Sequence, residues 1–97
     1  MSKVYAVVDC ADFGDDYSEC VVGVYSTIGA AEKRIRNLLK ENIKTYKEDQ
    51  KDLNLGEAKI FDLRKKIPIN EIIDGGFCYI DGSFERDSIR IIAVEVE

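Results

Sequence analysis

Two apolar runs separated by an acidic stretch constrain the fold of this chain more than any other feature. The runs, Val4–Val8 and Val21–Tyr25, are rich in the Val and Tyr residues that favour strands. If the strands cover residues 3–9 and 20–26, the connection is too long for a two-residue turn and too short for a parallel crossover. We therefore expect an antiparallel hairpin whose loop, residues 10–19, is long and acidic.

The first strand is expected to lie in the middle of a sheet because both of its faces are apolar. Val4, Ala6 and Val8 alternate onto one face, and Tyr5 and Val7 onto the other. Such a strand is typical of a position with cover on both sides, or with a partner on one of them.

A long amphipathic helix is expected after the second strand. Thr27 is suited to cap its N-terminus, and Glu32 lies early enough to interact with the positive end of the helix dipole. Apolar residues then recur at helical spacing, which predicts one buried stripe. The stripe consists of Ala31, Ile35, Leu38, Leu39, Ile43 and Tyr46. The helix is expected to end near residue 52, and no later than Gly56.

The middle of the chain leaves alternatives open. Residues 58–63 fit a short strand or a helical turn, and Pro68 argues against a central strand at its position. Asn70 is suited to cap a short helical turn over Glu71–Asp74, which the glycines from Gly75 would end.

Two further strands complete the expected fold. Phe77–Ile80 favours a strand, Asp81 and Gly82 favour a turn, and Ile89–Val96 alternates between two faces as a strand does. Strands and helix are segregated along the chain. Residues 1–97 therefore predict a single α+β domain, in which an antiparallel or mixed sheet of four to five strands packs against one long amphipathic helix.

Charge is divided between segments of the chain. The formal net charge of −5 separates into −4 over residues 1–26, +4 over residues 27–66 and −5 over residues 67–97. This division fits a solvated basic helix with ion pairs such as Glu32 with Arg36, or a two-faced surface that steers a charged partner. The acidic total and the lack of nucleic-acid-binding motifs disfavour direct binding of nucleic acid.

Several classes of chemistry find no support in the sequence. The chain contains no His, and its serines lack a nucleophile-elbow or phosphate-loop context. Cys10, Cys20 and Cys78 are expected as free thiols, although Cys10 and Cys20 could meet across the hairpin. The acidic loop could accept a divalent cation but lacks the ligand alternation of an EF-hand. We therefore expect a protein that is not an enzyme and needs no cofactor or metal.

The acidic loop is the strongest candidate for a contact surface. Its carboxylates gather around Phe13 in greater number than a hairpin connection needs, and an aromatic residue at a loop tip either folds back or meets a partner. A solvated loop without a partner remains the alternative. Carboxylates near the second turn extend the candidate surface. The expected partner-binding residues are Asp12, Phe13, Asp15, Asp16, Glu19, Asp81, Glu85 and Asp87.

The opening of the chain resembles a group of small phage and mobile-element proteins of unknown function. The resemblance rests on Val4–Val8, on the Gly-Val-Tyr-Ser-Thr segment Gly23–Thr27 and on Ala30–Glu32, and it covers about residues 3–40. The longer helix and residues 56–76 depart from the usual form of that group. These motifs are structural, so the resemblance implies a fold and a phage-like origin but no active site.

Small acidic proteins of such origin often act by binding a host protein, as anti-CRISPR inhibitors do. The resemblance therefore implies a non-catalytic module, a phage-type inhibitor of a host defence protein such as a CRISPR nuclease, whose acidic surface would fit a basic nucleic-acid channel. The alternative is a small-ligand-binding or homodimeric regulatory protein, with Tyr5, Tyr25 or Tyr79 at its pocket or seam. No signal-like or membrane-spanning segment is evident, so we expect a cytoplasmic protein, in the host cell if it is phage-encoded.

Overall fold

The computed structural model describes residues 2–14, 16–53, 58–82 and 85–96. Its elements, in chain order, are β1 (Ser2–Asp12), β2 (Tyr17–Tyr25), α1 (Ile28–Leu53), β3 (Lys59–Ile60), α2 (Ile69–Asp74), β4 (Phe77–Asp81) and β5 (Arg86–Val96).

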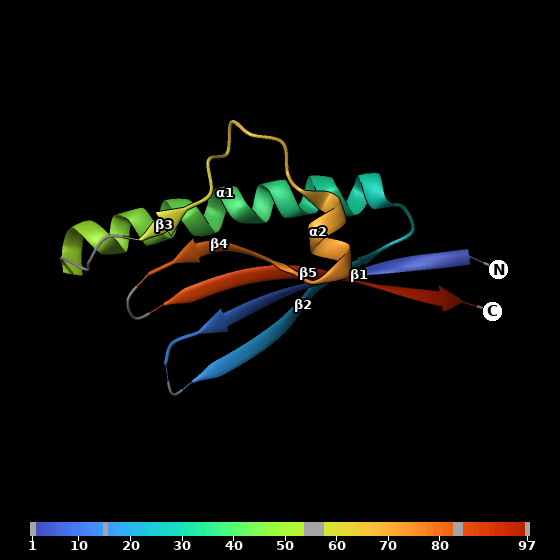
Figure 1. The fold of residues 1–97 in the computed structure, drawn as a ribbon, viewed down its shortest axis with the longest axis horizontal. Helices are drawn as coiled ribbons and strands as arrows, with labels where there is room; N and C mark the ends of the chain where they lie inside the picture. Colours follow the sequence, from blue (N-terminus) through green and yellow to red (C-terminus); the bar gives the residue numbers. More distant parts are fainter. Residues whose placement is uncertain (1, 15, 54–57, 83–84, 97) are drawn as a thin grey trace.

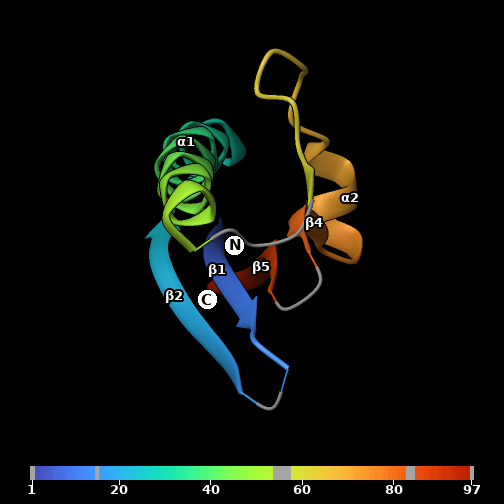
Figure 2. The same ribbon diagram turned by 90° about the vertical axis from the view of Figure 1, so that its left-hand side faces the viewer.

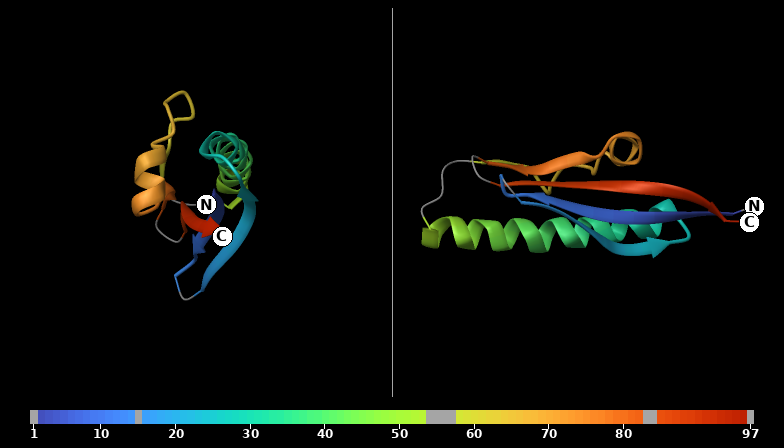
Figure 3. Two further views of the ribbon diagram at one scale, coloured as in Figure 1. Left: turned by 90° about the vertical axis from the view of Figure 1, so that its right-hand side faces the viewer. Right: turned by 90° about the horizontal axis from the view of Figure 1, so that it is seen from below.

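The strands form one antiparallel sheet in the order β2-β1-β5-β4-β3. The long helix α1 runs along one face of this sheet (Figures 1 and 2). The β1–β2 and β4–β5 hairpins turn at the same end of the molecule, whereas the two termini lie side by side at the other end (Figure 3). The predicted α+β fold is confirmed, and the sheet is antiparallel rather than mixed. β1 is an inner strand between β2 and β5, although the middle strand of the sheet is β5.

The face of the sheet that meets α1, called the helix face below, holds the core. The predicted helix stripe from Ala31 to Tyr46 is buried, as expected for an amphipathic helix on a sheet. It packs against alternate strand residues, among them Val7 of β1 and Ile89 and Ile91 of β5. Tyr5, Tyr25 and Tyr79 also belong to this side, so they do not line an exposed sheet face.

The first hairpin is tighter than its sequence suggests. Pairing of β1 with β2 continues to Asp12 opposite Tyr17, which shortens the predicted ten-residue loop to residues 13–16. The turn can be short because Gly14 adopts a φ of 82°, and because the Asp12 side chain accepts a hydrogen bond from the Gly14 amide at 3.1 Å. Polar residues that resembled a loop are therefore strand residues.

The two helices begin in different ways. The Thr27 hydroxyl accepts a hydrogen bond from the Ala30 amide at 3.1 Å, which confirms Thr27 as the cap of α1. The expectation that Asn70 caps the second helix is wrong, because α2 already begins at Ile69 and the residue before it, Pro68, makes no side-chain cap. α1 ends at Leu53, close to the predicted end; Gly56 lies outside the described residues.

The segment between the helices is held against α1 by an arginine. The Arg36 guanidinium donates to the backbone carbonyls of Leu63 at 3.0 Å and Lys65 at 3.4 Å, in place of the predicted pairing with Glu32. Of residues 58–63, only Lys59 and Ile60 form a strand. The hydrogen bonds from Arg36, and not a longer strand, therefore hold the segment between the helices against α1.

Candidate functional site

Two hairpin turns bring most of the predicted contact residues to one end of the sheet. Asp12 is in register with Arg86 of β5, which is in turn opposite Asp81 of β4. We call this region the acidic tip. It comprises Asp12, Phe13, Asp16, Asp81 and Glu85; the predicted contact residue Asp15 lies outside the described residues. Carboxylates far apart in sequence are thus neighbours through strand pairing.

The acidic tip exposes aromatic surface beside its carboxylates. Phe13 is 53% exposed and the neighbouring Tyr17 is 63% exposed. The Phe13 amide donates to the Asp16 carbonyl at 2.8 Å, and the Gly82 amide donates to the Glu85 carbonyl at 2.9 Å. A backbone hydrogen bond therefore joins the described residues on the two sides of each turn.

Glu19 differs from the other predicted contact residues because it already has partners within the chain. Its carboxylate pairs with the Arg90 guanidinium at 2.8 Å and accepts a hydrogen bond from the Tyr17 hydroxyl at 2.7 Å. The hydrogen bond to Glu19, followed by one with Cys10, raises the pKa of Tyr17. Glu19 therefore lies beside the acidic tip as a structural link between β2 and β5.

Asp87, another predicted contact residue, lies on the helix face of the sheet and not on the face opposite α1. It is only 8% exposed and belongs to the helix face, because strand alternation turns it away from its neighbour Arg86. Its pKa is raised to about 7, mainly by burial. A hydrogen bond with Glu85, the charge of Glu85 and the charge of Asp9 contribute further, in that order. Asp87 is therefore a buried carboxyl between the sheet and α1, unsuited to direct contact with a large partner.

Asp9, at the end of the predicted first strand, belongs to a polar network under α1. It accepts hydrogen bonds from the Tyr79 hydroxyl at 2.8 Å and from the Asn42 amide at 3.2 Å. Asn42 also donates to the Tyr79 hydroxyl at 2.7 Å. Burial first, and the Asp9 charge among the further causes, raise the pKa of Tyr79. This network ties three elements together and satisfies polar groups that α1 covers.

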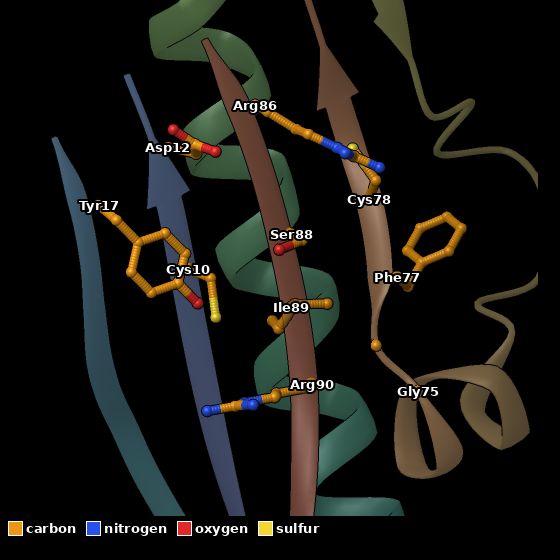
Figure 4. Close-up of a pocket in the computed structure, with 11 residues that line it drawn as sticks. Cys10, Asp12, Tyr17, Gly75, Phe77, Cys78, Arg86, Ser88, Ile89 and Arg90 are labelled. Carbon is orange, nitrogen blue, oxygen red and sulfur yellow. The ribbon is translucent and has the colours of Figure 1, made fainter. Parts of the chain in front are cut away.

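The face of the sheet opposite α1, called the open face below, has a polar half next to the acidic tip. A pocket of about 320 Å³ is hollowed there between β2, β1, β5 and β4 (Figure 4). Strand register places Cys10, Ser88 and Cys78 in one row across it. Figure 4 shows Arg90 directed toward β1 and Arg86 directed toward β4, with Ser88 between them. The pocket is polar and carries both signs of charge.

The pocket was missed in the sequence, although one signal for part of it was present. Arg86, Ser88 and Arg90 alternate along β5 and must therefore share a face. Their neighbours in the pocket include Cys10, Asp12 and Tyr17, which come from β1 and β2 at the other end of the chain and which no local pattern reveals. The possible pairing of Cys10 with Cys20 is excluded, since Cys10 is opposite Glu19 and all three cysteines are free thiols.

The described residues show no cluster of three or more metal-ligating side chains. No helix in the described part of the chain is both long and apolar enough to cross a membrane. Comparison with protein-family models, with curated proteins and with solved structures gave no match.

Proposed function

We propose that the protein is a non-catalytic binding module that docks its acidic tip on a basic surface of another protein. The observation that carries this proposal is the exposure of Phe13 and Tyr17 beside carboxylates from two hairpins. Exposed aromatic residues supply the anchors of many interfaces, and surrounding charge sets orientation and association rate. The combination fits a partner with an apolar recess rimmed by Lys or Arg.

The charge of the tip is available for such a partner. Among the described residues, the ion pairs within the chain are Arg64–Asp62 and Arg90–Glu19, so the carboxylates of the acidic tip are not bound in one. Arg86 is the one cation that the register places between Asp12 and Asp81. The tip therefore keeps a negative balance that would attract a cationic surface at low ionic strength.

The partner class that we propose is a host defence protein with a nucleic-acid channel, such as a CRISPR nuclease. Such a channel attracts closely spaced negative charge, and a small rigid domain with a carboxylate-rich end can occupy it in place of the phosphate backbone. The proposed action is competitive inhibition of nucleic-acid binding, without chemistry on the partner.

The test is a binding and DNA-cleavage assay with a purified, guide-loaded CRISPR nuclease. We expect the wild-type protein to bind and to slow cleavage, more strongly at low salt. The variant Asp12→Asn/Asp16→Asn/Glu85→Gln should weaken binding about tenfold or more. Asn at position 12 keeps the oxygen that accepts the Gly14 amide hydrogen bond, so the turn is preserved.

A matched control removes the same number of charges elsewhere. Glu41, Glu48 and Asp74 are exposed on the two helices, and their replacement by Gln, Gln and Asn should leave binding unchanged. Phe13→Ala should weaken binding without altering its dependence on salt. Equal binding by the two charge-removed triple variants would contradict the assignment of the acidic tip as the contact, and a failure of the wild type to bind would contradict the partner class.

The pocket of the open face favours one alternative function, the binding of a small ligand that carries an anionic group. Arg86 and Ser88 line the pocket next to the acidic tip, and Tyr17 closes its β2 side. A ligand that binds there should raise the melting temperature by mass action. Screening small phosphates and carboxylates against the wild type and Ser88→Ala tests this: a shift that Ser88→Ala keeps in full would place the ligand elsewhere.

A further inference from the structure

We propose that two copies of the chain associate through the apolar half of the open face, the half that lies nearest the termini. This inference is independent of the proposed function because it uses a different surface from the acidic tip. It rests on strand register, on exposure and on the placement of charge.

The apolar half is a continuous patch across three strands. Val24 of β2, Ala6 of β1 and Ile92 of β5 form one row, since Ala6 is in register with both of the others. The next rows toward the termini pair Val4 with Val94 and Ser2 with Val96. On the side nearer the pocket, Val21 borders the patch. The large exposed residues of the patch are Val21, Val24, Ile92, Val94 and Val96, each between 42% and 61% exposed.

A β-bulge contributes to the patch. The register of β2 shifts between the partners of Val7 and Val8, so that Gly23 is opposite Val7 and Val21 opposite Val8. Val22 is the extra residue, and it packs toward the core. Because of this bulge, Val21 and Val24 both lie on the open face.

The shape of the patch is complementary to itself. Ala6, a small residue on the central strand, lies between the larger Val24 and Ile92. The row therefore has a trough over β1 between two ridges. When two sheets stack face to face, a ridge of one copy can enter the trough of the other, and a two-fold axis makes both contacts at once.

Charge is placed so that this face can be buried. Strand alternation turns Lys3 and Glu95 away from it, and Arg90 and Glu19, which lie on the open face beside the patch, are already paired with each other. Burial of the patch would therefore leave no isolated charge. The acidic tips lie at the opposite end of each copy, so their carboxylates are kept away from the seam.

The area of the patch fits a modest dimer. The five large residues expose roughly 400 Å² per copy, so two copies with their flanking residues would bury about 1,000 Å² in total. This is below the range of about 1,200–2,000 Å² for stable interfaces and close to the minimum of about 1,000 Å² for a weak, transient one. We therefore expect a reversible dimer whose population depends on protein concentration.

Sedimentation velocity of the full chain, from about 5 to about 500 µM, tests the proposal. We expect a shift from monomer to dimer across this range. Val24→Glu and Ile92→Glu should each raise the dissociation constant at least tenfold, because an interface with two-fold symmetry receives each new charge twice. Both positions are exposed strand sites, so circular dichroism should report an unchanged fold.

The matched control is Ile28→Glu, which adds the same charge at an exposed apolar residue at the start of α1. It should dimerise as the wild type does. A wild-type protein that remains monomeric at the highest concentration would overturn the proposal. This result is expected if the patch binds a foreign partner instead of a second copy. Equal dissociation constants for Ile92→Glu and Ile28→Glu would also overturn it. Neither result concerns the acidic-tip triple variant, so one proposal can be contradicted while the other stands.

Discussion

Side chains alternate between the two faces of the sheet along every strand, but the two faces differ in how far their apolar residues are buried. On the helix face, residues such as Val7, Ile89 and Ile91 are almost fully buried under α1, and the polar groups of Asp9 and Tyr79 are hydrogen bonded to each other. On the open face, apolar residues of β2 and β5 remain 42% to 61% exposed, beside a pocket lined by Arg86 and Arg90.

This contrast separates stability from interaction. Burial under α1 supplies the hydrophobic free energy that holds the domain together, whereas exposed side chains on the open face and the acidic tip contribute little to it. Substitutions on the open face can therefore probe binding without unfolding the chain. The contrast itself can be tested by paired substitutions on the two faces.

The largest expected effect comes from removal of core volume on the helix face. Ile35 is fully buried in α1, and Ile35→Ala should lower the free energy of unfolding by about 3 kcal/mol through lost burial and the cavity left behind. Val24→Ala on the open face should lower it by less than about 0.5 kcal/mol in a monomer. Urea denaturation of both variants at low protein concentration measures the difference. Similar losses would mean that the open face is covered in solution.

A pH dependence follows from the buried carboxyl of Asp87. Its pKa is raised to about 7, whereas an Asp in an unfolded chain titrates near about 4. The folded state therefore holds the proton more tightly, so the contribution of Asp87 to the free energy of unfolding is complete below about pH 4 and is lost as the pH rises through about 7. We expect that loss to be on the order of 2 kcal/mol, because the group is partly screened by solvent.

Asp87→Asn removes this titration and should make the protein more stable than the wild type at pH 8, with little difference at pH 4. Denaturation curves at several pH values measure the difference between the two proteins. Asp81→Asn is the control, because Asp81 is exposed at the acidic tip. Parallel pH profiles for the wild type and Asp87→Asn would contradict the assignment.

The smallest expected difference concerns two tyrosine hydroxyls, one on each face. Tyr79→Phe removes the donor to Asp9 and the acceptor of Asn42 under α1, and should lower the free energy of unfolding by about 1.5 kcal/mol. Tyr17→Phe removes an exposed hydrogen bond to Glu19 and should lower it by less than about 0.5 kcal/mol. Thermal denaturation ranks the two variants. The reverse ranking would show that the open-face link between Tyr17, Glu19 and Arg90 holds the sheet together.

Local patterns were sufficient for most of the elements and for the Thr27 cap, but not for the cap expected at Asn70. The stripe of α1, the Thr27 cap and the two faces of β5 follow from spacing and side-chain chemistry that involve residues close in sequence. The end of β1 could not be read in this way. The segment Cys10–Asp12 looks like part of a loop, and only pairing with β5 and β2 makes it a strand.

The candidate site was predicted in part for the same reason. Phe13 and the carboxylates of the two turns were identified from composition, and strand pairing between β1, β5 and β4 brings the turns together. Glu19 and Asp87 have other roles because alternation along a strand says which residues share a face, without saying which face a helix will cover. The pocket beside Ser88 depends wholly on strand order and has no local signature.

The sequence by itself determined the α+β class, the inner position of the first strand, the amphipathic helix and the concentration of negative charge near two turns. Tertiary structure alone decided which face of β1 meets α1. Both faces of that strand are apolar, so its sequence is compatible with cover on either. Once α1 covers Val7, Asp9 becomes part of a buried polar network, and Ala6 with its neighbours is left as an exposed apolar patch. The choice depends on the whole core, because only one arrangement buries the helix stripe, Ile89 and Ile91 together.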